Sequence, residues 1–128
     1  MYSIQPATGD ITLPRGDTLL FTIRMNREFP DGTAAVFGIC GARRGLPTTN
    51  VFTKTFPVNG SEIIVLLANR DTRGIAAGSY LWDVRIVTDP EYDDGGSVKC
   101  DDETDNVTSI YSGGVMPTFT LTEVAANV

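Results

Sequence analysis

The chain has 128 residues, of which 41% are hydrophobic and 20% charged, with 13 glycines and 7 prolines. This composition excludes a disordered chain and suits one domain with a core of its own. No apolar run approaches the roughly 18 residues of a membrane span, and the first ten residues, MYSIQPATGD, lack the basic and apolar regions of an export signal. We therefore expect a protein that stays in the cytoplasm where it is made, or in a particle assembled there.

The net charge of -6 is concentrated in one acidic segment, residues 89–105, where eight acidic residues accompany Lys99 alone. Such a segment argues against nucleic acid binding through it, because phosphates need positive partners. We predict a mobile, projecting loop or loose hairpin that is solvated or docks on a basic partner. A loose calcium site remains an alternative, although neither acidic run has the spacing of an EF-hand. Its weak candidate ligands are Asp89, Glu91, Asp93, Asp101, Glu103 and Asp105.

In chain order, three stretches of the first half are typical of strands. Polar and apolar side chains alternate in TLLFTIRM, residues 18–25, which predicts a strand with one buried face. AAVFGIC, residues 34–40, predicts a second strand, and VFTKTFPV, residues 51–58, predicts a third. Between these two lies GARRGLPTTN, residues 41–50, whose glycine, proline and polar residues predict a loop.

The third strand has the marks of a sheet edge. Pro57 cannot donate a ladder hydrogen bond, and Lys54 lies in the middle of the stretch. Asn59-Gly60 is a strong tight-turn signal, and an apolar run follows at once. We therefore predict a hairpin over residues 51–67. An unpaired edge accepts another chain readily, so weak self-association is expected. Its charged component, Arg43 and Arg44 of one copy facing the acidic segment of the next, should weaken as salt rises.

The second half continues with a short crossover and further strands. We expect Asp71 to cap one helical turn through the N–H groups that follow it, and Gly78 to end that turn. SYLWDVRI, residues 79–86, predicts a central strand, and residues 106–124 supply one or two closing strands. Seven or eight short strands predict an all-β, immunoglobulin-like antiparallel β-sandwich, formed by residues 1–128 as a single domain with the acidic segment as an excursion.

Tyr80 is predicted to fix the crossover between the two sheets. Immunoglobulin-like sandwiches carry a tyrosine at this corner, and its hydroxyl bonds back to the backbone of the turn. The alternative is an ordinary core tyrosine. Trp82 lies two residues further on, so it shares the inward face and is predicted to fill the centre of the core.

Short motifs give the chain a family resemblance. Gly16-Asp17-Thr18 precedes the first long strand, Asp71-Thr72 opens the crossover, and Gly78, Tyr80 and Asp83 follow. With these motifs the chain resembles small immunoglobulin-like proteins encoded among the structural genes of tailed phages and prophages. The closing stretch GGVMPTFTLTEVA departs from the family pattern, because Met116-Pro117 is inserted and alanine follows Glu-Val.

The resemblance implies a non-enzymatic structural or interaction module of a phage or prophage particle, present in several copies. It implies other particle proteins as partners, with a homo-oligomer as a further option, and neither nucleic acid nor a membrane. It implies a place in the host cytoplasm during assembly and then in the virion. Baseplate, tail-fibre and head-appendage modules share these features, so the position in the particle stays open.

Arg15-Gly16-Asp17 spells a cell-adhesion tripeptide. An adhesion ligand needs an exposed loop tip, whereas here a strand begins directly after Asp17. We expect Gly16 to permit a turn and Asp17 to bind nearby N–H groups, with Arg15 merely preceding them. Adhesion is therefore not expected.

Few residues carry chemistry. The chain has no histidine, and its two cysteines cannot form a four-ligand zinc site. We expect no catalytic site, no metal and no cofactor. Cys40 and Cys100 are expected to be free thiols, with a disulfide as the alternative.

The basic pair Arg43-Arg44 lies in the predicted loop. It is either a plain surface turn or a docking point for the acidic segment of an adjacent copy in a ring. The alternative function for the whole chain is a bacterial surface or secreted carbohydrate-binding module. Such a module should carry an export signal and a row of exposed aromatic residues, and the sequence predicts neither.

Overall fold

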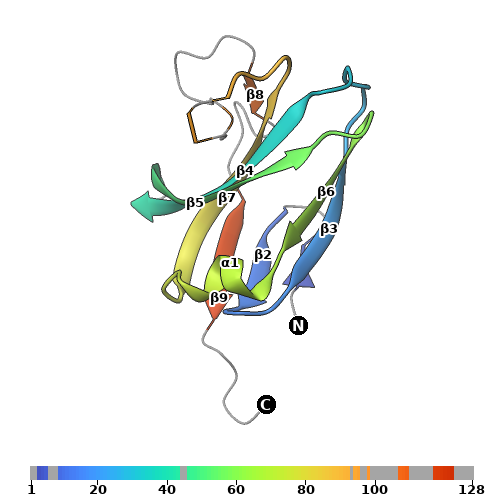
Figure 1. Cartoon of the computed structure of the whole chain (residues 1–128). Coiled ribbons are helices and arrows are strands. Elements are labelled where there is room, and N and C mark those ends of the chain that lie inside the picture. Colours follow the sequence, from blue (N-terminus) through green and yellow to red (C-terminus); the bar gives the residue numbers. More distant parts are fainter. Residues whose placement is uncertain are drawn as a thin grey trace.

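The computed structural model describes residues 3–5, 9–43, 46–92, 94–95, 98, 107–109 and 117–122. They form two β-sheets packed face to face, with one short helix at one end (Figure 1). The predicted all-β sandwich is confirmed. The elements are β1 (Ser3–Ile4), β2 (Ile11–Pro14), β3 (Leu19–Arg24), β4 (Ala34–Arg43), β5 (Leu46–Pro57), β6 (Glu62–Leu67), α1 (Asn69–Arg73), β7 (Gly78–Val87), β8 (Val107–Ser109) and β9 (Thr118–Thr122).

The larger sheet has the order β1-β2-β9-β7-β4-β5, and the smaller sheet is β3-β6. β7 is central, as predicted: β4 pairs along one side, and β9 and then β8 pair along the other. The strands β9-β7-β4-β5 of the larger sheet lie next to one another in that order, and the smaller sheet β3-β6 packs across them. Within the described residues every pairing is antiparallel except β2 with β9, which is parallel.

Trp82 lies at the centre of the core, as predicted, and is 2% exposed. Its ring stacks on Phe37, with centroids 5.5 Å apart, and meets Phe21 edge-on at 5.8 Å. Its Nε1–H donates to the Gly9 carbonyl at 2.9 Å, so the one polar atom of the indole is satisfied. Phe119 of β9 packs against Phe37 from the same sheet and is fully buried. These contacts join both sheets around one aromatic cluster.

The predicted loop over residues 41–50 is wrong. β4 continues to Arg43, β5 begins at Leu46, and the two residues pair with each other. The β4–β5 hairpin therefore extends away from the sandwich (Figure 1). Backbone hydrogen bonds between two neighbouring strands need no buried face. The alternation of apolar side chains that reveals a strand is accordingly lost in this stretch.

The predicted hairpin over residues 51–67 is also wrong, although its turn is present. Asn59 and Glu62 exchange two backbone hydrogen bonds of 2.9 and 3.0 Å. The strands on either side belong to different sheets, because β5 pairs with β4 and β6 pairs with β3. The Val58 N–H donates to the Thr33 carbonyl of the β3–β4 connection, which holds the end of β5 beside β4. The tight turn thus changes sheets instead of closing a ladder.

Candidate functional site

The crossover between β6 and β7 is fixed by Tyr80. Its hydroxyl donates to the Ala76 carbonyl at 2.6 Å, so the predicted bond back to the turn is present. Gly78 was expected to end the helical turn, and this is wrong: α1 ends at Arg73 with Gly74 as its C-cap, and Gly78 opens β7. The Gly74 N–H donates to the Thr72 carbonyl, and Gly74 has an ordinary right-handed φ of -84°, so the helix does not end on a left-handed glycine.

Asp71 holds the start of the helix in a way that the sequence did not reveal. It is the third helical residue, and its carboxylate accepts the N–H of the preceding Ala68 at 2.7 Å, so the predicted cap of later N–H groups is wrong. The same oxygen accepts Lys54 Nζ at 2.8 Å. Lys54 also donates to the Leu66 carbonyl at 3.1 Å. One lysine of β5 therefore ties the larger sheet to β6 and α1.

The adhesion-like tripeptide lies against α1. The Gly16 N–H donates to Thr72 Oγ1 at 3.1 Å, with Gly16 at a φ of 83°. Arg15 does more than precede the turn, because its Nη2 donates to the Arg73 carbonyl at 2.8 Å. The Asp17 N–H donates to the Pro14 carbonyl at 3.1 Å, and binding of other N–H groups by its carboxylate stays a prediction. The turn is thus anchored to the helix and is not a loop tip.

The remaining predicted site residues are only partly described. Arg43 is the last residue of β4, and Arg44 lies outside the described residues, so the predicted basic loop becomes a strand end. Asp89 and Glu91 are exposed beyond the end of β7. Outside the described part of the chain lie Asp93, Cys100, Asp101, Glu103 and Asp105.

Calcium binding and cysteine pairing accordingly stay predictions. Cys40 is buried in β4. Within the described ranges, no three histidine, cysteine or acidic side chains lie together as metal ligands would.

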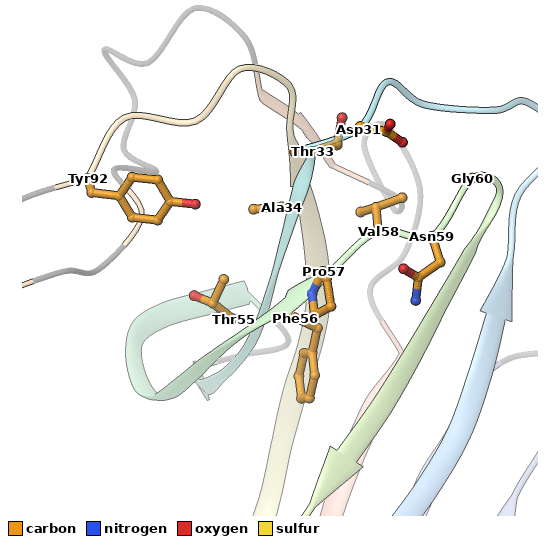
Figure 2. Close-up of a pocket in the computed structure, with 11 residues that line it drawn as sticks. Asp31, Thr33, Ala34, Thr55, Phe56, Pro57, Val58, Asn59, Gly60 and Tyr92 are labelled. Atoms are coloured by element: carbon orange, nitrogen blue, oxygen red, sulfur yellow. The ribbon is translucent and has the colours of Figure 1, made fainter.

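A hollow of 410 Å³ opens among the loops at the end of the sandwich away from α1 (Figure 1), and Figure 2 shows its lining residues. It is formed by the start of β4, the end of β5, the β5–β6 turn and Tyr92, which follows β7. In Figure 2 the Tyr92 ring extends toward Ala34 with its hydroxyl leading, and its side of the hollow is open, since the residue is 58% exposed. Sequence reasoning missed this hollow because three separate segments of the chain build it, residues 31–34, residues 55–60 and Tyr92. The lining residues are Asp31, Gly32, Thr33, Ala34, Thr55, Phe56, Pro57, Val58, Asn59, Gly60 and Tyr92.

Part of the outer face of the smaller sheet is apolar, although it faces solvent. Leu20 and Ile64 are each 51% exposed, and Leu66 is 44% exposed. Leu20 pairs directly with Leu66, and Thr22 pairs with Ile64, so the three apolar side chains are adjacent. The sequence carried a signal for this face, because EIIVLL lacks the polar positions of a strand with one solvated side. We call Leu20, Ile64 and Leu66 the apolar face.

Searches of protein-family models, curated proteins and solved structures find no match to this chain. Among the residues that the structure describes, no helix has the length and apolar character to cross a membrane.

Proposed function

We propose that the protein is a non-enzymatic structural and interaction module of a tailed-phage or prophage particle, present in several copies. The single observation that carries this proposal is the apolar face, three adjacent exposed side chains on the two-stranded sheet. Contiguous exposed apolar side chains on a small soluble domain typically mark a contact with another protein. The resemblance to phage immunoglobulin-like proteins supplies the kind of partner, namely neighbouring proteins of the particle.

The structural positions of the resembling motifs support this proposal. Gly16 permits the turn before β3 and bonds to α1, and Asp71 and Tyr80 hold the two ends of the crossover. These residues stabilise the scaffold and leave the outer surfaces free to vary with the partner. In such a module the fold supplies rigidity and the exposed face supplies contact.

The test replaces Ile64 with glutamate and compares it with Thr12→Glu, a change of the same charge at an exposed position of β2. A buried carboxylate in the contact should lower incorporation into particles roughly tenfold, which corresponds to about 1.4 kcal/mol of binding. Quantitative mass spectrometry of gradient-purified particles measures the copies of each variant. Equal incorporation of Ile64→Glu would contradict a contact through the apolar face.

A second candidate function, saccharide binding, is favoured by the hollow alone. The exposed Tyr92 ring on one side of the hollow, with the carboxylate of Asp31 and the amide of Asn59 on the other side (Figure 2), offers stacking and hydrogen bonds to a neutral sugar. Titration with a panel of neutral oligosaccharides, followed by chemical shifts of the Asn59 and Gly60 amides, tests it. Chemical-shift changes that appear with an oligosaccharide in the wild-type chain and are lost in Tyr92→Ala would support saccharide binding.

A further inference from the structure

The hollow and the helix α1 lie at opposite ends of the sandwich (Figure 1). β6 runs from the β5–β6 turn at the hollow to α1, and β7 runs back from beyond α1 toward Tyr92. A strand rises about 3.3 Å per residue, so the ten residues of β7 separate the two ends by roughly 30 Å. Surfaces this far apart cannot contact each other in one copy.

The α1 end is basic. Arg70 and Arg73 are both exposed in the last turn of the helix. Arg15 adds a third guanidinium, since it is bonded to the Arg73 carbonyl. The nearby carboxylates are Asp17 and Asp71, and the latter is occupied by Lys54. The apolar face continues from this end, because Leu66 lies three residues before α1.

The hollow end is acidic. Three connections lie at this end: the β3–β4 connection, the β5–β6 turn and the stretch that follows β7. Their described residues carry five carboxylates and one basic side chain, Arg27. The Arg27 guanidinium lies over the Phe29 ring, 4.3 Å from its centroid. The hollow between these loops has an apolar lining from Ala34, Pro57 and Val58, with the exposed Tyr92 ring at its edge. A cationic, partly apolar surface suits this site best. The five acidic residues are Glu28, Asp31, Asp89, Glu91 and Asp94.

We infer that the hollow of one copy receives the α1 end of a second copy. Charge complementarity carries the inference: exposed arginines on one end match exposed carboxylates on the other. A guanidinium can bond to a carboxylate in bidentate fashion and stack on an aromatic ring. The two arginines Arg70 and Arg73 can therefore use both partners that the hollow offers, the Tyr92 ring on one side and the Asp31 carboxylate on the other (Figure 2). The inference rests on the proposed multi-copy function, and it specifies the surfaces through which two copies touch.

Such a contact is head to tail. Its two surfaces differ, so each added copy leaves both a free hollow and a free α1 end, and assembly yields rings or filaments instead of closed dimers. The docking of Arg43 and Arg44 on the acidic segment of an adjacent copy stays a prediction. The inferred contact instead uses the arginines of α1.

The edge of β5 is a weaker route to self-assembly. β5 ends the larger sheet, as predicted. Val51 is an extra residue opposite the step from Ile39 to Cys40, which bulges the strand. The bulge, Pro57 at the end of the strand and the inward-pointing Lys54 in its middle are three features that hinder pairing of β5 with another chain.

The test uses two double variants that each remove one surface. Arg70→Ala with Arg73→Ala removes the basic end, and Asp31→Ala with Tyr92→Ala removes the acceptor. Sedimentation velocity of the wild-type chain should show oligomers that grow with concentration and shrink between 0.05 and 1 M salt, because screening shortens from over ~10 Å to ~3 Å. Each double variant should weaken association at least roughly tenfold.

The decisive sample is an equimolar mixture of the two double variants. Each retains the surface that the other lacks, so the mixture should form one-to-one pairs and stop there. Arg27→Ala is the matched control: it removes an arginine from the acidic end, and association should be unchanged or stronger. Melting curves of all variants check that they fold.

Three outcomes would overturn the inference. They are a monomeric wild-type chain at about 1 mM in low salt, a mixture that stays monomeric, and assembly that neither double variant weakens. Any of these leaves the proposed particle function standing if purified particles contain several copies. Absence of the chain from particles would instead contradict the function.

Discussion

Replacing Lys54 with methionine tests the tie between the sheets, because it removes the cation and keeps most of the apolar side chain. Lys54 Nζ lies 2.8 Å from Asp71 Oδ2, and the two side chains are 31% and 13% exposed. At an effective dielectric constant of about 20, this separation gives roughly 6 kcal/mol of attraction. Lost hydration of both ions and about 2 kcal/mol of lysine side-chain entropy offset most of it.

A net contribution of about 2 kcal/mol remains, which is the usual scale for a hydrogen bond between charged groups. Lys54→Met should therefore lower the free energy of unfolding by about 2 kcal/mol and the Tm by roughly 5–10 °C. Urea denaturation measures the change, with fluorescence of the single, buried Trp82 as the signal. In a double-mutant cycle with Asp71→Asn, the two losses should overlap by about 1–2 kcal/mol.

The matched control is Arg24→Met. It breaks the Arg24–Glu62 pair, whose atoms are 3.5 Å apart and whose side chains are 81% and 48% exposed. An exposed pair contributes little, so this loss should stay within about 0.5 kcal/mol. Additive losses in the cycle, to within about 0.3 kcal/mol, or an equal loss in Arg24→Met, would refute the role given to Lys54.

Three further changes test the scaffold by the same denaturation assay. Tyr80→Phe should cost about 0.5–1.5 kcal/mol, because one hydrogen bond is lost and water can reach the exposed Ala76 carbonyl; unchanged stability would contradict the corner. Trp82→Ala should cost about 3–5 kcal/mol, or prevent folding, and a fully stable variant would contradict its central place in the core. Gly16→Ala should cost about 1 kcal/mol, since its φ is 83°, whereas Gly74→Ala, with a φ of -84° and open space around it, should be neutral or stabilising. Equal effects at the two glycines would show that backbone conformation is not the cause.

The elements that the sequence predicted well are those with a buried face. In β3 and β9 the side chains alternate between the more buried and the more exposed face as predicted. In β7 the predicted inward residues Trp82, Val84 and Ile86 are buried, although Leu81 and Val87 of its other face are buried too. Tyr80 was found for a related reason, because its position two residues after Gly78 places it at the start of a strand that crosses between sheets. Local periodicity carries this information, so it is readable without any knowledge of partners.

The choice of pairing partner could not be predicted in the same way. The Asn59-Gly60 turn gives a local signal, but the sheet that each flanking strand joins depends on β3 and β4, which lie far away in the chain. The same holds for Lys54, whose partners Leu66 and Asp71 lie beyond that turn. A mid-strand lysine predicts an edge, and the sequence alone does not reveal that its side chain points inward.

Of the candidate contact surfaces, one could be predicted from local sequence and two could not. The apolar face could have been found, since EIIVLL is apolar at every position after Glu62. The hollow could not, because its lining comes from segments that begin at Asp31 and end at Tyr92. The basic end likewise arises when Arg15 of the β2–β3 turn meets the arginines of α1.

We propose that this sandwich is a multi-copy component of a phage particle. The most direct test of this proposal is the number of copies of the wild-type chain per particle, measured by quantitative mass spectrometry on gradient-purified particles against a capsid protein of known copy number. We predict several copies per particle that remain bound through high-salt washing, because the apolar face does not depend on charge. A chain that is absent from the particle fractions and present only in the lysate would contradict the account.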